Sequence, residues 1–193
     1  EIGSGLVGSE MCIRDRLTLR RFLCVLLSAA LLAAGWLGLS GLPLVVALVP
    51  LLWISRSYGS SRRDWWGMFG WAWLAFVLWN GATIWGLWYS TPVGPFAATL
   101  VSTFLNMLAF MLFHTVSKRA HKALAYTLLV AGWIATEYWY TVGEFSFPWL
   151  LLGNGFANDT WAVQWYEYTG IFGGTLSVSY THLRAHETGA YLV

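Results

Sequence analysis

Few side chains in the long apolar runs of this chain could do chemistry. They are the carboxylate of Glu137, the thiol of Cys24, the imidazole of His114 and the amides of Asn80 and Asn106. Acyl or phosphoryl transfer needs a nucleophile, a base and an oxyanion stabiliser held together. The sequence contains no G-x-S-x-G, Walker A, H-E-x-x-H or paired-cysteine motif that would signal such a set. It therefore predicts no catalytic residues, no metal site and no cofactor in this chain.

Glu137 is the strongest functional candidate of this group. A carboxylate in an apolar helix is costly unless it is paired, hydrated or protonated. Its position near the end of the run 123–140 also suits snorkelling or a hydrogen bond from helix to loop, and the sequence favours such a role over catalysis.

The other polar side chains have structural interpretations. Cys24 is expected to be an inert buried thiol, and Asn80 and Asn106 to form hydrogen bonds between helices. His114 is interpreted as a histidine at a membrane interface rather than a ligand, because no second metal-binding residue has helical spacing to it. The abundant tryptophans are interpreted as interfacial anchors.

The elements that must position these residues are apolar segments long enough to be membrane helices. The chain has 193 residues, of which 58% are hydrophobic and only 10% charged, a balance that leaves too little polar surface for a water-soluble globule. A bilayer core needs about 20 apolar residues per helix. We expect an all-α, polytopic transmembrane bundle, with spans and connections in this order: 22–39, a hairpin or re-entrant pair at 44–54, 65–89, 96–116, 123–140, an outer interfacial loop at 141–167, and the start of a sixth helix at 168–176.

The basic residues indicate how this bundle is oriented. All eight Lys and Arg between Leu17 and Leu176 lie before the first span, between the second and third, or between the fourth and fifth. The positive-inside rule places these connections and the N-terminus in the cytoplasm, so the loop 141–167 would be periplasmic. The bases do not form one face, which argues against nucleic acid as a partner.

The two ends differ from the rest of the chain. Residues 1–16 lack apolar periodicity and the pattern of a signal peptide, and residues 177–193 turn abruptly polar after a glycine-rich apolar run. Both resemble translated adapter sequence, so we expect them to be non-native. This sets aside Cys12, His182 and His186, and predicts that the native segment is 17–176; a disordered native tail at each end is the alternative.

The outer region carries the most distinctive sequence. Phe147, Pro148 and Trp149 lead through three leucines to Gly153 and Asn154. Pro148 fixes a turn and Gly153 permits a close backbone approach. A lipid-exposed rim with a shaped groove is therefore expected here.

Four motifs then resemble apolipoprotein N-acyltransferase, in a version similar to that of Bacteroidetes-type bacteria. They are TEYW around Glu137, FPWLLLGN from Phe147, VQWYEYTG from Val163 and GGTL from Gly173. Two positions depart from the family pattern: Tyr140 stands where an arginine often follows the glutamate, and Ser177 where an aromatic residue is expected.

The resemblance implies an inner-membrane acyltransferase that moves an acyl chain from a phospholipid to the N-terminal cysteine of a diacylated apolipoprotein. The family's catalytic glutamate, lysine and cysteine lie in a nitrilase-like domain that has no counterpart here. The chain is therefore expected to be a fragment, inactive by itself. The resemblance assigns lipid-substrate access to Phe147, Pro148, Trp149, Gly153 and Glu137. A small transporter or channel component and a non-catalytic membrane scaffold are the alternatives.

Overall fold

The computed structural model describes the backbone of residues 3–142 and 148–191, and the side chains of 15–142 and 148–184. Within these residues the chain is all-α and has no strand. The described residues form six α-helices: α1 (Gly3–Ala33), α2 (Val49–Arg56), α3 (Arg62–Ile84), α4 (Gly94–Ser117), α5 (Lys122–Val142) and α6 (Tyr166–Tyr191). The same part of the chain contains five short 3-10 helices: η1 (Leu42–Val46), η2 (Trp85–Tyr89), η3 (Pro148–Leu150), η4 (Leu152–Phe156) and η5 (Thr160–Ala162).

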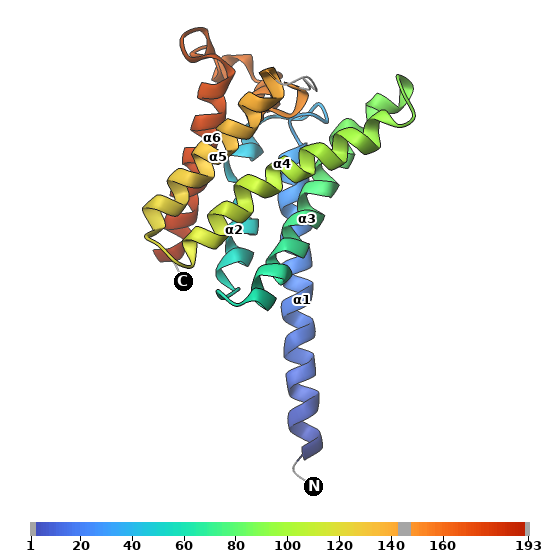
Figure 1. The fold of residues 1–193 in the computed structure, drawn as a ribbon, viewed down its shortest axis with the longest axis vertical. Helices are drawn as coiled ribbons and strands as arrows, with labels where there is room; N and C mark the ends of the chain where they lie inside the picture. Colours follow the sequence, from blue (N-terminus) through green and yellow to red (C-terminus); the bar gives the residue numbers. More distant parts are fainter. Residues whose placement is uncertain (1–2, 143–147, 192–193) are drawn as a thin grey trace.

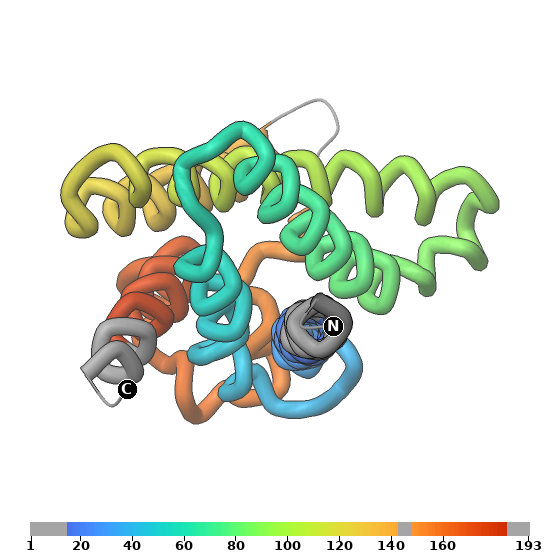
Figure 2. The backbone as a smooth tube through the Cα atoms, turned by 90° about the horizontal axis from the view of Figure 1, so that it is seen from below, coloured from blue at the N-terminus to red at the C-terminus, as the bar shows by residue number. Residues whose placement is uncertain are grey.

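The helices form two layers. In Figures 1 and 2, α3, α4 and α5 form one layer, and α2 lies between α1 and α6 in the other. The first part of α1 projects beyond the bundle, and the α3–α4 hairpin extends away from α5 and α6. In the described residues one helix, α4, has the length and hydropathy required of a candidate membrane span.

The two ends of the bundle differ in character. One end, which we call the loop end, is formed by residues 34–48 and 148–165. The opposite end, which we call the basic end, contains the last residue of α2 and the connections 57–61 and 118–121. Arg21 of α1 is tied to the basic end, because its guanidinium donates to Tyr58 Oη and Ser57 Oγ, each at 3.1 Å.

Local sequence explains several helix boundaries. Ser61 caps α3, where its Oγ accepts the Asp64 N–H at 3.1 Å and donates to Asp64 Oδ2 at 2.8 Å. Pro95 occupies the first turn of α4, where its missing N–H costs nothing. The helix α6 is kinked at Gly170, whose φ of 65° is left-handed.

Several expected boundaries were wrong. The first span ends at Ala33 rather than residue 39, because glycines at 35, 38 and 41 are poor helix formers. The third changes to a 3-10 turn after Ile84 instead of continuing as α-helix to Tyr89. The sixth helix begins at Tyr166, inside the expected outer loop, and runs on to Tyr191.

The core is aromatic and joins three helices. Phe76 of α3 packs edge-on against Phe110 of α4 and Trp133 of α5, with ring centroids 5.9 and 5.8 Å apart. Trp79 stacks on Trp133 at 6.5 Å and meets Trp36 at 5.6 Å. Trp79 and Trp133 are buried, so interpreting all tryptophans as interfacial anchors was wrong; for exposed ones such as Trp66 the anchoring role stays a prediction.

Asn80 and His114, two of the buried polar residues, each have a side-chain partner. Asn80 donates to Thr103 Oγ1 at 3.0 Å, which is the predicted hydrogen bond between helices. His114 is buried, with Nδ1 2.8 Å from Ser55 Oγ in α2; its place at a membrane interface stays a prediction. No group of three His, Cys, Asp or Glu that could hold a metal occurs in the described part of the chain.

Candidate functional site

The buried carboxylate of Glu137 joins three elements at the loop end. Its Oε1 accepts the backbone N–H of Leu152 in η4 at 2.7 Å. Its Oε2 accepts the hydroxyl of Thr175 in α6 at 2.6 Å. Glu137 is only 2% exposed, so both hydrogen bonds are shielded from water, and a hydrogen bond is electrostatically stronger in such an interior than in water. This is the bond from helix to loop that the sequence favoured for Glu137.

Gly153 lies directly beside this carboxylate. Its N–H donates to Thr175 Oγ1 at 3.3 Å, and its carbonyl accepts the Tyr166 hydroxyl at 3.1 Å. A Cβ at this position would collide with the backbone carbonyl of Ile171. The close approach of η4 to α6 therefore requires glycine at 153.

Pro148 and Trp149 form an exposed edge of the same loop. Asn154 Nδ2 donates to the carbonyl of Pro148 at 2.6 Å, and Trp36 Nε1 donates to that of Trp149 at 2.9 Å. The Trp149 ring is 58% exposed, so the backbone is fixed while the indole faces outward. Phe147 lies outside the described residues.

A second buried carboxylate, Asp159, anchors this loop to the segment after α1. Its Oδ2 accepts the Ser40 hydroxyl at 3.0 Å and the Gly41 N–H at 2.5 Å. A Cβ on Gly41 would stand 2.5 Å from the carbonyl oxygen of Gly155. The two loops therefore pack backbone on backbone.

A groove of about 410 Å³ opens between these loops. Trp36 and Gly38 line it from the first loop, and Trp149, Asn154 and Asn158 from the second. The expected groove is thus present, with Trp149 on its wall. Glu137 and Gly153 do not line it; they hold the loop that does.

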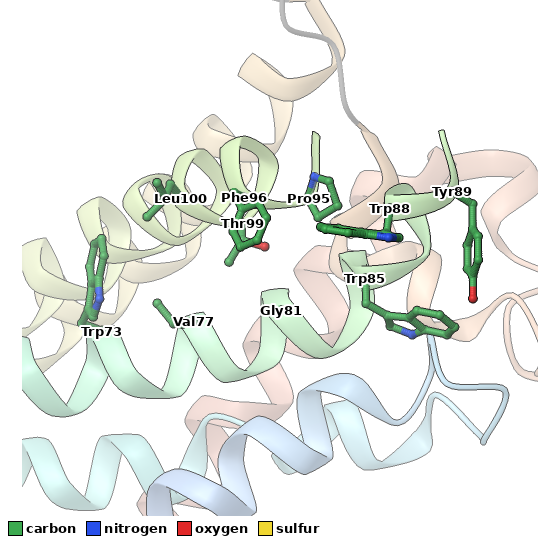
Figure 3. A pocket seen from close by; sticks show the side chains of 10 residues that line it. All are labelled: Trp73, Val77, Gly81, Trp85, Trp88, Tyr89, Pro95, Phe96, Thr99 and Leu100. Carbon is green, nitrogen blue, oxygen red and sulfur yellow. The ribbon is translucent and has the colours of Figure 1, made fainter. Parts of the chain in front are cut away.

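A larger apolar groove of about 620 Å³ lies between α3 and α4. Figure 3 shows Val77 and Gly81 along α3 opposite Phe96 and Leu100 along α4, with Trp88 near the hairpin turn. Aromatic and aliphatic side chains dominate its lining. Such a surface suits an apolar chain rather than a polar solute.

The structure therefore brings together Glu137, Gly153, Pro148 and Trp149, four of the five residues chosen from the sequence. Sequence reasoning missed Thr175, Tyr166 and Asp159. A hydroxyl within an apolar helix, as at Thr175, must find a buried partner, and this is the sequence signal that could have marked it. The arrangement can hold the loop in a rigid position. Both hydrogen bonds described above for the Glu137 carboxylate contribute to that positioning.

These features define an all-helical bundle that presents an anchored, aromatic loop at one end. Residues 25–182 match the family described as apolipoprotein N-acyltransferase N-terminal domain, and the chain belongs to that family. It is also 30% identical over 163 residues to the apolipoprotein N-acyltransferase of Chlorobaculum tepidum, covering 82% of this chain and 30% of that protein's length. No solved structure matches the chain.

Proposed function

We propose that this chain is the membrane half of an apolipoprotein N-acyltransferase of the bacterial inner membrane. In the whole enzyme it would hold the phospholipid acyl donor and admit the diacylated apolipoprotein acceptor, while a further domain performs the transfer. The observation that supports this proposal most directly is the family match over residues 25–182. Because the chain spans only 30% of the relative's length, it is expected to be inactive alone.

The surface of the bundle supports placement in lipid. Many large apolar side chains are exposed, for example Leu100, Phe104 and Leu108 along α4, each at least half exposed. A soluble protein rarely exposes such a continuous apolar face. The helices α3 and α5 have 23 and 21 residues, enough to cross about 30 Å of hydrocarbon, although their Trp, Tyr, Thr and Asn content lowers their mean hydropathy. We propose that all of the long helices cross the membrane, with the basic end cytoplasmic.

Within this proposal the two grooves receive lipid. The α3–α4 groove takes an acyl chain, and the loop-end groove beside Trp149 guides the substrate to the reacting domain. Phe147, Pro148 and Trp149 would contact substrate, whereas Glu137 and Gly153 position their loop. A transporter would be expected to keep several ionisable groups facing the bundle interior; here the Glu137 carboxylate is engaged by Leu152 and Thr175.

A chimera tests the proposal. Residues 25–176 replace the matching segment of the Chlorobaculum tepidum enzyme, and acylation of a diacylated lipopeptide by phospholipid is measured in detergent. We expect activity in the chimera and at least tenfold less after Trp149→Ala, with Trp161→Ala as an exposed tryptophan control. A folded chimera without activity would contradict the assignment.

The foreign nature of residues 1–16 and 177–193 also remains a proposal. Their abrupt change in polarity supports it. Sequencing the genomic DNA past the codon for Leu176 tests it together with the proposed further domain. A frame that continues into further helices and a nitrilase-like domain supports both, whereas an immediate stop favours the scaffold alternative.

A further inference from the structure

A small pocket at the basic end is lined by cations from three segments. Arg56 ends α2, Lys118 follows α4 and Lys122 begins α5, and all three line one cavity of about 240 Å³. None of its lining residues, all in the described part of the chain, is Asp or Glu. Cations gathered around one cavity repel one another, and an anion bound there would offset this repulsion.

The position of Lys118 is fixed rather than free to swing away. Its Nζ donates to the carbonyl of Ser55 at 2.9 Å, and the Ser55 side chain is in turn held by His114. Burial lowers the pKa of Lys118; Asp64 opposes this shift, and Arg56 adds to it. The neighbouring cation therefore disfavours the charged lysine, which a bound anion would stabilise.

The floor of the same pocket is apolar. Leu52, Phe113 and Tyr126 are buried there, and the Phe113 and Tyr126 rings stack with centroids 5.6 Å apart. The cavity is several times the roughly 30 Å³ occupied by one water, so it can hold a phosphodiester with part of its glycerol. A cationic mouth above an apolar floor fits an amphipathic anion better than a free ion.

We propose that this pocket binds the phosphate of an anionic phospholipid from the leaflet at the basic end. Lys118, Lys122 and Arg56 bind the phosphodiester oxygens, and the first turn of α5 adds its positive dipole end. The glycerol carbons rest on Phe113 and Tyr126. Basic pockets between membrane helices on the cytoplasmic side bind lipid headgroups in this way. The inference rests on the membrane placement proposed above, and it adds a lipid site at the end of the bundle opposite the loop end.

The test measures lipid retention by the full 193-residue chain, purified in a non-ionic detergent. Native mass spectrometry follows titration with phosphatidylglycerol, phosphatidylcholine or inorganic phosphate. We expect phosphatidylglycerol to bind in preference to phosphatidylcholine, and excess inorganic phosphate to compete weakly. The double variant Lys118→Gln/Lys122→Gln should lose about tenfold in affinity for phosphatidylglycerol.

Two matched variants separate the pocket from general surface charge. Arg62→Gln/Arg63→Gln removes two exposed cations that do not line the pocket, and should change affinity less than twofold. Lys118→Arg/Lys122→Arg keeps both charges and should keep the binding. Equal losses in the two glutamine variants, loss in the arginine variant with its helix content unchanged, or full competition by inorganic phosphate would each overturn the proposal. A chain that stays monodisperse without detergent would instead contradict the membrane placement itself.

Discussion

At Glu137, one carboxylate controls the position of a loop fifteen residues further along the chain. Truncating it leaves the Leu152 N–H and the Thr175 hydroxyl buried without their acceptor. The cost of an unsatisfied buried polar group is larger than the net gain of an ordinary hydrogen bond. The residue therefore matters for the geometry of the loop even if it never touches a substrate.

Glu137→Ala should destabilise the protein by about 3 kcal/mol, since the buried Leu152 N–H and Thr175 hydroxyl both lose their acceptor. Chemical unfolding followed by tryptophan fluorescence in detergent measures the change. Glu167→Ala, which removes an exposed carboxylate, should have little effect. Equal stability of the two variants would show that the buried bonds contribute nothing.

Gly153→Ala should also destabilise the protein, by about 1–3 kcal/mol, because its methyl group overpacks the contact with Ile171. Gly70→Ala is the control, since a Cβ there meets nothing within 4 Å and alanine favours helix. Thermal unfolding of the two variants should therefore shift in opposite directions. A neutral Gly153→Ala would show that η4 and α6 can separate at no cost.

At the scale of elements, the length and composition of the apolar runs predicted the apolar helices well. The runs 96–116 and 123–140 became α4 and α5 with small changes at their ends. The burial of Trp79 was not predictable in this way, because it depends on Trp36 and Trp133, which lie far away in sequence. The Asp159 anchor was missed for the same reason: its partners, Ser40 and Gly41, lie over a hundred residues earlier.

The Ser61 cap gives a prediction for α3. Ser61→Ala should destabilise the helix by about 1 kcal/mol, because the Asp64 N–H loses its acceptor. Ser60→Ala, one residue outside the cap, should be neutral. Denaturant titration of both variants checks the difference, and identical midpoints would contradict the capping role.

At the scale of the whole molecule, the structure gathers the basic connections at one end and the anchored loops at the other. The alternation of charge along the sequence predicted this separation. The sequence could not show how the loops pack, because their contacts form between backbones rather than through a recognisable side-chain pattern. The family match adds the class of protein but not the direction of insertion.

Cysteine labelling tests that direction in whole cells. In a background carrying Cys12→Ser and Cys24→Ser, a membrane-impermeant thiol reagent should label Asn158→Cys at the loop end but not Ser60→Cys at the basic end. Both sites are exposed, and labelling after cell lysis controls for reactivity. Labelling of Ser60→Cys alone in intact cells would invert the proposed topology.

The bond from Asp159 to Ser40 and Gly41 has a consequence for biogenesis. A ribosome makes the segment after α1 more than a hundred residues before the carboxylate that secures it. Closing so long a loop is entropically slow compared with forming adjacent hairpins. The segment after α1 therefore stays without this anchor until Asp159 has been synthesised, and the contact is expected to form late in assembly.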